Sequence, residues 1–361
     1  MQFFAFNSVV GVVMAMMVLS GCSKPAHKAV KNDTDVLKEM AYGHILARSI
    51  HEITYFKVAD DIDGATSLET IAHKRNLDKN ALARVINVLL NHGIFAKNQQ
   101  GFLQHTSLSM PLKSGGEKSL QAAFTKEHDV RRWSALGRMD IALTQGKSPF
   151  HVLYGEGFYD YLEHDKAAAD LFNAGMSGFS EQEARVIAQE FDCAPFQAIY
   201  DIGGGNGGLL REILARNPKA KGHLFDLKDA VASAPLLQDP LFKDRAFGHV
   251  GDFFTSIPQG GDLYMVKRVL HNWDDEHSLT ILRNAQQALG SNKNARVIVI
   301  EKILPKNPDG SLLVDTDLIG LAFGDGRERT EEEFKALGKQ AGLVLERIVP
   351  TSSGVSVMVF K

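Results

Sequence analysis

The chain has 361 residues, of which 44% are hydrophobic and 23% charged, and its formal net charge is −3. This average composition excludes a disordered chain, a fibrous repeat and a polytopic membrane protein, and the length predicts two domains. The near-neutral charge is not the basic footprint of a nucleic-acid binder, and two cysteines cannot build a disulfide framework or a cysteine-rich metal site. We therefore expect no nucleic-acid partner and no bound metal.

The first 22 residues have the pattern of a bacterial lipoprotein signal. Residues 9–19 form an apolar run that is too short to span a bilayer but has the length of a signal's hydrophobic region. The run ends in Leu19-Ser20-Gly21-Cys22, which resembles a lipobox with Cys22 as the lipidated residue. Residues 23–34 would then be a tether. Because no lysine or arginine precedes the run, a mis-set start codon or an uncleaved anchor remains an alternative.

Residues 35–112 are expected to form a winged helix. A capping box is predicted at residues 66–69, and a helix at residues 79–92, where Leu82, Ile86 and Leu89 lie on one face. A short hairpin should follow over residues 94–103. A winged helix can bind DNA or mediate dimerisation. The second helix offers only Lys79 and Arg84 as cations, which favours dimerisation.

Residues 113–190 are predicted to be connecting helices. This stretch is rich in aromatic residues, which usually build a core but can also line a pocket for a flat, apolar ligand. We expect these helices to line the substrate pocket.

Residues 191–361 are predicted to form a third segment, in which short apolar strands alternate with helices. Strands are expected at 198–202, 223–225, 263–266, 297–300, 344–348 and 355–360, and helices at 209–215, 276–289 and 331–341. This alternation predicts an α/β fold with an open, mostly parallel sheet and helices on both faces.

A glycine cluster, residues 203–208, follows the first of these strands and opens a helix. Glycines there let the backbone adopt positive φ and approach a nucleotide, and Asp226 ends the next strand, where an acid can accept hydrogen bonds from ribose hydroxyls. These residues alone leave NAD and S-adenosylmethionine as alternative cofactors.

Several motifs in one order separate the two cofactors. DIGGGNGG, HLFDL, GDFF, KRVLHNWDDEH, EKILP and GRERTEEEF, preceded by FNAGM, resemble the S-adenosylmethionine-dependent O-methyltransferases. That family includes the plant caffeate and flavonoid enzymes and bacterial polyketide and hydroxyneurosporene methyltransferases. The resemblance covers roughly residues 36–361. It implies a Rossmann-like class I methyltransferase sheet with a mainly helical N-terminal winged-helix domain that dimerises.

The resemblance also implies roles for single residues. His271 would be the general base, flanked by Glu301 and Glu328. The acceptor wall would include Phe172 and Met176, and Asn272 stands where several plant members have aspartate, which leaves the acceptor geometry open. The cofactor would be held by Gly203, Gly205, Asp226, Leu227, Asp252, Phe253 and Lys267.

These inferences predict a homodimeric enzyme that transfers a methyl group from S-adenosylmethionine to a hydroxyl of a small aromatic acceptor. One alternative is a relative with the same cofactor that hydroxylates or decarboxylates its substrate. Another is a non-enzymatic winged-helix regulator that senses a small ligand. Residues 1–22 indicate a membrane tether through Cys22, whereas the cofactor, which is made in the cytoplasm, indicates a cytoplasmic enzyme.

Overall fold

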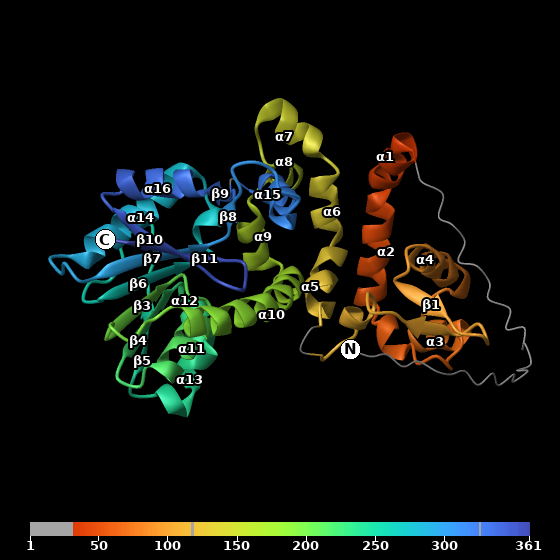
Figure 1. Ribbon diagram of the computed structural model, residues 1–361, viewed down its shortest axis with the longest axis horizontal. Helices are drawn as coiled ribbons and strands as arrows, with labels where there is room; N and C mark the ends of the chain where they lie inside the picture. The colour runs from red at the N-terminus through yellow and green to blue at the C-terminus, as the bar shows by residue number, and fades with distance from the viewer. Residues whose placement is uncertain (1–31, 117–118, 325) are drawn as a thin grey trace, which may run out of the picture. The chain divides into compact units, whose positions relative to one another are not determined.

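The computed structural model describes residues 32–116, 119–324 and 326–361 (Figure 1). Internal contacts divide the chain into two units, residues 1–44 and 45–361. The predicted signal, its lipobox with Cys22 and the tether up to residue 31 lie outside the described residues. In the first unit, Asn32 caps helix α1 (Asp33–Ala41) by accepting a hydrogen bond from the Asp35 N–H at 3.0 Å. Among the described residues, no helix combines the length and apolar character needed to cross a bilayer.

The second unit begins within α2 and continues with helices and a hairpin in the order predicted for a winged helix. These elements are α2 (Gly43–Tyr55), η1 (Val58–Asp61), α3 (Leu68–Lys74), α4 (Lys79–Asn91), β1 (Phe95–Lys97), β2 (Leu103–His105) and η2 (Met110–Leu112). Strands β1 and β2 pair antiparallel, and one apolar core that includes Ile53, Ile71 and Leu89 joins the helices to the hairpin.

The capping box predicted at residues 66–69 is wrong. Ser67 caps α3 by accepting from the Thr70 N–H at 3.1 Å. The Thr66 hydroxyl instead donates to Asp63 at 2.9 Å, because the helix begins one residue later than predicted, with Ser67 as its N-cap. Glu69 forms an ion pair with Lys79.

Connecting helices follow, and they surround an aromatic core. They are α5 (Gln121–Thr125), η3 (Lys126–His128), α6 (Val130–Leu136), α7 (Met139–Gln145), α8 (Pro149–Tyr154), α9 (Phe158–His164) and α10 (Lys166–Glu190). The buried rings of Phe150, Phe158 and Phe323 meet in this core. Because Phe323 ends α15 (Leu312–Phe323), a helix from late in the sequence packs against this segment.

A seven-stranded sheet carries the rest of the unit, and its mostly parallel pairing confirms the predicted α/β fold. Its strand order is β10-β11-β7-β6-β3-β4-β5, and β11 runs antiparallel to both of its neighbours. The remaining pairings are parallel. The strands are β3 (Ala198–Ile202), β4 (Lys221–Asp226), β5 (Ala246–Val250), β6 (Leu263–Lys267), β7 (Arg296–Glu301), β10 (Leu345–Pro350) and β11 (Ser356–Phe360). A separate parallel pair joins β8 (Ile303–Leu304) to β9 (Arg329–Thr330).

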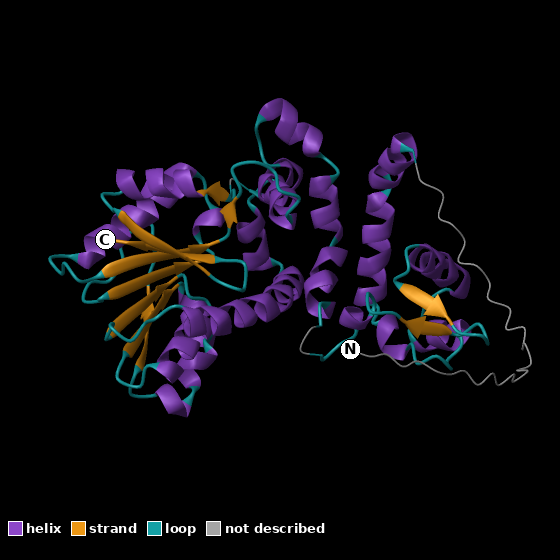
Figure 2. Cartoon of the chain, viewed as in Figure 1, coloured by secondary structure: helices purple, strands orange, loops and turns teal. Residues whose placement is uncertain are grey.

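Helices cover both faces of the sheet (Figure 2). They are α11 (Gly208–Arg216), α12 (Lys228–Ser233), α13 (Pro235–Gln238), α14 (Asp275–Leu289) and α16 (Glu331–Gln340), with the short η4 (Pro240–Phe242) and η5 (Leu270–Asn272) in the loops. Alternate strand residues point to opposite faces. Ile199 and Ile298 therefore pack with α10, α11 and α13, whereas Tyr200 and Val297 pack with α14 and α16. This arrangement leaves the carboxyl ends of the parallel strands to carry the site.

Candidate functional site

The glycine turn after β3 forms an open cradle. Gly203, Gly205 and Gly207 have φ of 68°, 57° and 76°, a region that strains other residues. A Cβ on Gly203 would lie 2.9 Å from Val269, and one on Gly207 would lie 2.8 Å from Leu236, so both positions are closely packed. Nothing lies within 4 Å of the Cβ position of Gly205, so this residue faces open space.

Two carboxylates stand at the ends of the neighbouring strands. Asp226 ends β4, and its Oδ2 accepts from the Gly205 N–H at 2.8 Å, which fixes the turn against β4. Asp252 follows β5, and its Oδ1 accepts from the Phe254 N–H at 2.8 Å. Phe253 lies against Gly203, with ring carbons 3.4 and 3.8 Å from the Cβ position, while Leu227 is exposed beside Asp226. The structure therefore brings together the cofactor residues predicted near the glycine turn.

A third carboxylate lies beneath the turn. Asp201, in β3, is buried, and its Oδ2 has no hydrogen-bond partner. Burial raises the pKa of Asp201 to about 7, against the opposing influence of Lys267. The Lys267 ammonium is itself bound to α10, at 3.1 Å from Glu183 and 3.0 Å from the Ser180 hydroxyl. An edge with three carboxylates and a paired lysine suits a cationic ligand that carries hydroxyl and amine donors better than an anionic pyrophosphate.

His271 lies on the short turn η5 that follows β6. Its Nδ1 is 3.2 Å from Oε2 of Glu301, the last residue of β7, and that carboxylate is fully buried. Glu301 also accepts from Arg268 Nη1 at 2.8 Å. Burial alone would raise the pKa of Glu301, but His271 and Arg268 outweigh it and lower the pKa to about 2. Glu301 is therefore an anion beside the imidazole.

Glu328 reaches this cluster through Arg268. Its carboxylate accepts from Arg268 Nη1 and Nη2 at 3.3 and 3.1 Å, and its backbone N–H donates to Asp317 at 2.7 Å. Arg268 thus joins Glu301 to Glu328, and it does so from a backbone with φ of 53°. Glu328 was predicted to flank His271. In the structure its carboxylate instead binds the Arg268 guanidinium.

Arg329 fastens the turn that carries His271. The side chain is fully buried and donates to the carbonyl oxygens of Leu270 at 2.9 Å and Trp273 at 2.8 Å, and to Asp275 at 2.8 Å. A Cβ on Gly326 would lie 2.4 Å from the His271 carbonyl oxygen, so the backbone of that loop packs directly on the turn. The turn is therefore held by the Arg329 guanidinium, through two carbonyl oxygens, and by the backbone at Gly326, which packs against it.

The acceptor side brings Asn272 close to an aromatic wall. The Tyr159 hydroxyl, from α9, donates to Asn272 Oδ1 at 2.7 Å. The Tyr159 ring stands edge-on to Phe172 of α10, with centroids 6.2 Å apart. Met176 lies one turn further along α10 and is 39% exposed. Tyr159, Arg268 and Arg329 were not predicted to have a role in the site, although the motifs KRVLHNWDDEH and GRERTEEEF contain the two arginines.

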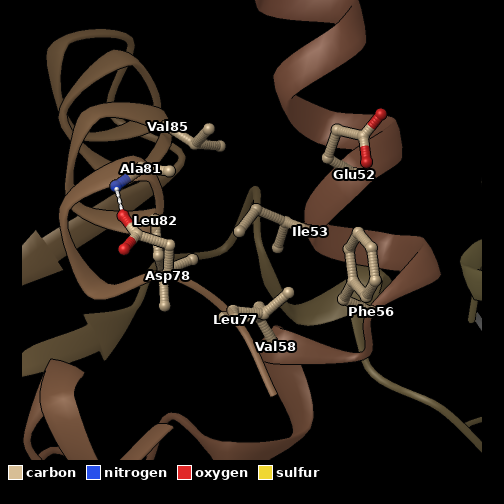
Figure 3. Close-up of a pocket in the computed structure, with 9 residues that line it drawn as sticks. All are labelled: Glu52, Ile53, Phe56, Val58, Leu77, Asp78, Ala81, Leu82 and Val85. Atoms are coloured by element: carbon tan, nitrogen blue, oxygen red, sulfur yellow. Dashed lines mark hydrogen bonds between the residues drawn. The ribbon is translucent and has the colours of Figure 1, made fainter. Parts of the chain in front are cut away.

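A separate groove lies between α2 and α4 (Figure 3). At one end, Asp78 caps α4 by accepting from the Ala81 N–H at 2.7 Å. The described residues that line it are apolar apart from two acids, and they are Glu52, Ile53, Phe56, Val58, Leu77, Asp78, Ala81, Leu82 and Val85. No predicted site residue is among them, so this groove is distinct from the His271 site.

Known proteins are similar to this chain in sequence and in fold. The sequence model of the O-methyltransferase domain matches residues 133–344, more than half of the chain. The phenazine O-methyltransferase PhzM of Lysobacter antibioticus is 31% identical over 331 residues, which are 90% of this chain and 95% of that protein. The structure of the mitomycin 7-O-methyltransferase MmcR matches with a TM-score of 0.84 at 28% identity, over 91% of this chain and 97% of that one. NcsB1, an O-methyltransferase solved with S-adenosylmethionine and 2-hydroxy-5-methyl naphthoic acid, matches with a TM-score of 0.75 at 28% identity, over 88% and 96%.

Proposed function

The chain belongs to the S-adenosylmethionine-dependent O-methyltransferases, and we propose that it methylates a hydroxyl of a small aromatic acceptor with His271 as the general base. The observation that carries this proposal is the pairing of His271 with a buried, ionised Glu301 beside Asn272 and an aromatic wall. The naphthoic acid bound to NcsB1 supports an aromatic acceptor. Membership of this family also decides between the two cofactors that the glycine turn left open, in favour of S-adenosylmethionine.

The residues at the carboxyl edge of the sheet fit this cofactor. S-adenosylmethionine supplies a methyl group on a positively charged sulfur, which leaves as a neutral thioether when an oxygen displaces it. The open face of Gly205 leaves room for the amino-acid end, and Gly203 completes the turn. Asp226 would hold the ribose hydroxyls with Leu227 near the adenine, and Asp252 would accept from the adenine amine with Phe253 against the ring. Lys267 would also contact the cofactor at this edge, where Glu183 and Ser180 hold its ammonium group.

His271 is suited to take the proton of the attacking hydroxyl. Because Glu301 engages Nδ1, the opposite ring nitrogen, Nε2, is left for the acceptor. A phenol has a pKa near 10, so its proton must leave as the oxygen attacks. The Glu301 carboxylate stabilises the imidazolium that forms, and Arg268 holds Glu301 and Glu328 in place. Phe172 and Met176 would bound the acceptor ring, so that its hydroxyl is held in line for attack.

We also propose a division of the chain into five parts and a homodimer. The parts are residues 1–22, 23–34, 35–112, 113–190 and 191–361, with residues 35–112 as the dimerisation domain. We propose that α15, which belongs to the last of these parts, adds to the surface that the dimerisation domain buries, because it carries exposed apolar side chains, among them Leu312, Leu318 and Leu321.

Replacing His271 tests the proposed mechanism. We expect His271→Ala to lower kcat by about 10²–10⁴-fold in transfer of labelled methyl to phenolic acceptors, because the hydroxyl loses its base. Calorimetry should show unchanged affinity for S-adenosylhomocysteine, because the His271 ring contacts Glu301 rather than the residues of the glycine turn. His277→Ala is the matched control, since His277 pairs with Asp274 on the exposed start of α14. Unchanged turnover in His271→Ala would refute the assigned base.

A further inference from the structure

Asn272 offers a hydrogen-bond pattern that an aspartate at this position would lack. A carboxylate only accepts hydrogen bonds, whereas an amide has one accepting oxygen and an NH₂ group that donates. Asn272 follows His271 directly on η5. Its side chain contacts Tyr159, whose ring packs against Phe172 of the proposed acceptor wall. If the NH₂ group of Asn272 faces the acceptor, it favours a hydrogen-bond acceptor next to the reacting hydroxyl. If the amide oxygen faces it, a donor is favoured there.

The surroundings of Asn272 fix which end of the amide is which. The Tyr159 hydroxyl bonds one end at 2.7 Å, and the backbone carbonyl oxygen of Arg268 lies 3.5 Å from the other. A carbonyl oxygen can only accept, so the end that faces Arg268 must be the NH₂ group. Oδ1 then faces Tyr159 and accepts its proton. Because 3.5 Å is at the limit of a hydrogen bond, the group of Asn272 without a strong partner is Nδ2.

Tyr159 is held so that this arrangement persists. Its ring is edge-on to Phe158 at 5.5 Å and to Phe172 at 6.2 Å, which fixes the position of the hydroxyl on α9. The charges nearby are already paired, since Arg268 bonds both Glu301 and Glu328. The amide NH₂ of Asn272 is therefore a donor that these described contacts leave available to an acceptor.

On the premise of the proposed function, we propose that Asn272 Nδ2 binds an accepting oxygen, such as a ketone or quinone carbonyl, on the ring atom next to the hydroxyl that is methylated. In such a compound the hydroxyl proton is bonded internally to the neighbouring carbonyl. Donation from Nδ2 competes for that carbonyl and frees the proton for His271. A vicinal diol presents a second hydroxyl instead. Its phenolic oxygen is a weaker acceptor for Nδ2 than a carbonyl oxygen, and Tyr159 already takes up part of the accepting capacity of Oδ1 for its O–H.

Two acceptors with matched single rings test this assignment: ortho-hydroxyacetophenone, with a carbonyl beside the hydroxyl, and catechol, with a second hydroxyl. The affinity of the full chain for each is measured by calorimetry in saturating S-adenosylhomocysteine, and kcat/KM is measured separately with S-adenosylmethionine. We expect the wild type to bind the ketone at least about tenfold more tightly, the scale of one hydrogen bond to a group that otherwise stays unpaired. Equal affinities, a preference for catechol, or binding of neither compound would overturn the proposal.

Three variants link the preference to the amide. Asn272→Asp should reverse the preference, because a carboxylate repels the carbonyl and accepts from the diol. Tyr159→Phe should reduce it, because Oδ1 becomes free to accept from catechol. Tyr161→Phe is the matched control on the same helix, since Tyr161 contacts Arg131, and its preference should equal that of the wild type. A preference that Asn272→Asp leaves unchanged, in a variant that still binds S-adenosylhomocysteine, would refute the role of Asn272.

The two measurements separate this inference from the proposed function. A ketone preference in binding that Asn272→Asp reverses supports the inference even where no methyl group is transferred to either compound, a result that would refute methyl transfer to such hydroxyls. Methyl transfer with a preference that Asn272→Asp does not change supports the proposed function and refutes the inference.

Discussion

Glu301 keeps a charge at full burial because donors surround it. The His271 ring, the His271 backbone N–H and the Arg268 guanidinium all point at its two oxygens. A buried carboxylate without such partners would be neutral. The residue that orients the proposed base is therefore also a source of pH-dependent stability.

We expect the free energy of unfolding to depend on pH through Glu301. The pKa of this carboxyl falls from an ordinary 4.5 to about 2 in the folded chain. A lowered pKa gives stability that is complete above the unfolded value and is lost as the pH falls from about 4.5 towards 2, because the unfolded chain takes up the proton first. The free energy of unfolding of the wild type, measured in urea, should therefore fall by an amount of the order of a few kcal/mol across this range.

Glu301→Gln checks the source of this dependence. The amide does not titrate, so the variant should lose less stability than the wild type between pH 5 and pH 3, whatever its stability at pH 7. Glu332→Gln, on the exposed side of α16, is the control and should follow the wild type. Parallel pH profiles for Glu301→Gln and the wild type would assign the loss to other carboxyls.

At the scale of elements, the turn η5 owes its position to a strand pair distant in sequence. Arg329 in β9 donates to Leu270 and Trp273, 59 and 56 residues away along the chain. Because those carbonyls lie on either side of His271, the guanidinium sets where the imidazole stands. Arg329 is a positioning residue, since it acts on the reaction through the turn.

We expect Arg329→Lys to lower kcat roughly 10²-fold, the cost of a misplacement of about 1 Å. Lysine keeps the charge but lacks the planar fork that spans two carbonyls and Asp275. S-adenosylhomocysteine affinity should stay within about twofold, because the glycine turn is not touched. Arg327→Lys is the control from the same loop, with a side chain that is 42% exposed and paired with Glu333. A variant with wild-type kcat would show that the turn holds its shape without Arg329.

Local sequence predicted the elements that follow a simple pattern. Helix α4 and strand β7 appear where the apolar spacing placed them, because each buries a regular set of side chains. Strand β5 was not predicted, since Phe247 and Val250 are exposed and the strand buries no continuous run. The site divides in the same way. The glycine turn and the His271 motif are contiguous in sequence, whereas Tyr159 meets Asn272 across 113 residues, a contact that only the folded chain reveals.

At the scale of the whole molecule, the proposed homodimer depends on surfaces that one chain leaves open. Helix α15 turns Ile319 and Phe323 into the aromatic core, while Leu318 and Leu321 face outward at 50% and 40% exposure. Adjacent exposed leucines on a helix that is apolar on both sides are typical of an interface. These two leucines therefore give the dimer a direct test.

We expect light scattering at micromolar concentration to give about twice the chain mass of 39.6 kDa. The double variant Leu318→Gln and Leu321→Gln should shift the species towards monomer, because two amides would be buried without partners at the interface. Leu241→Gln, at an 80% exposed leucine on η4, is the matched control and should leave the mass unchanged. A monomeric wild type would refute the homodimer, and a double variant that remains dimeric would place the interface away from α15.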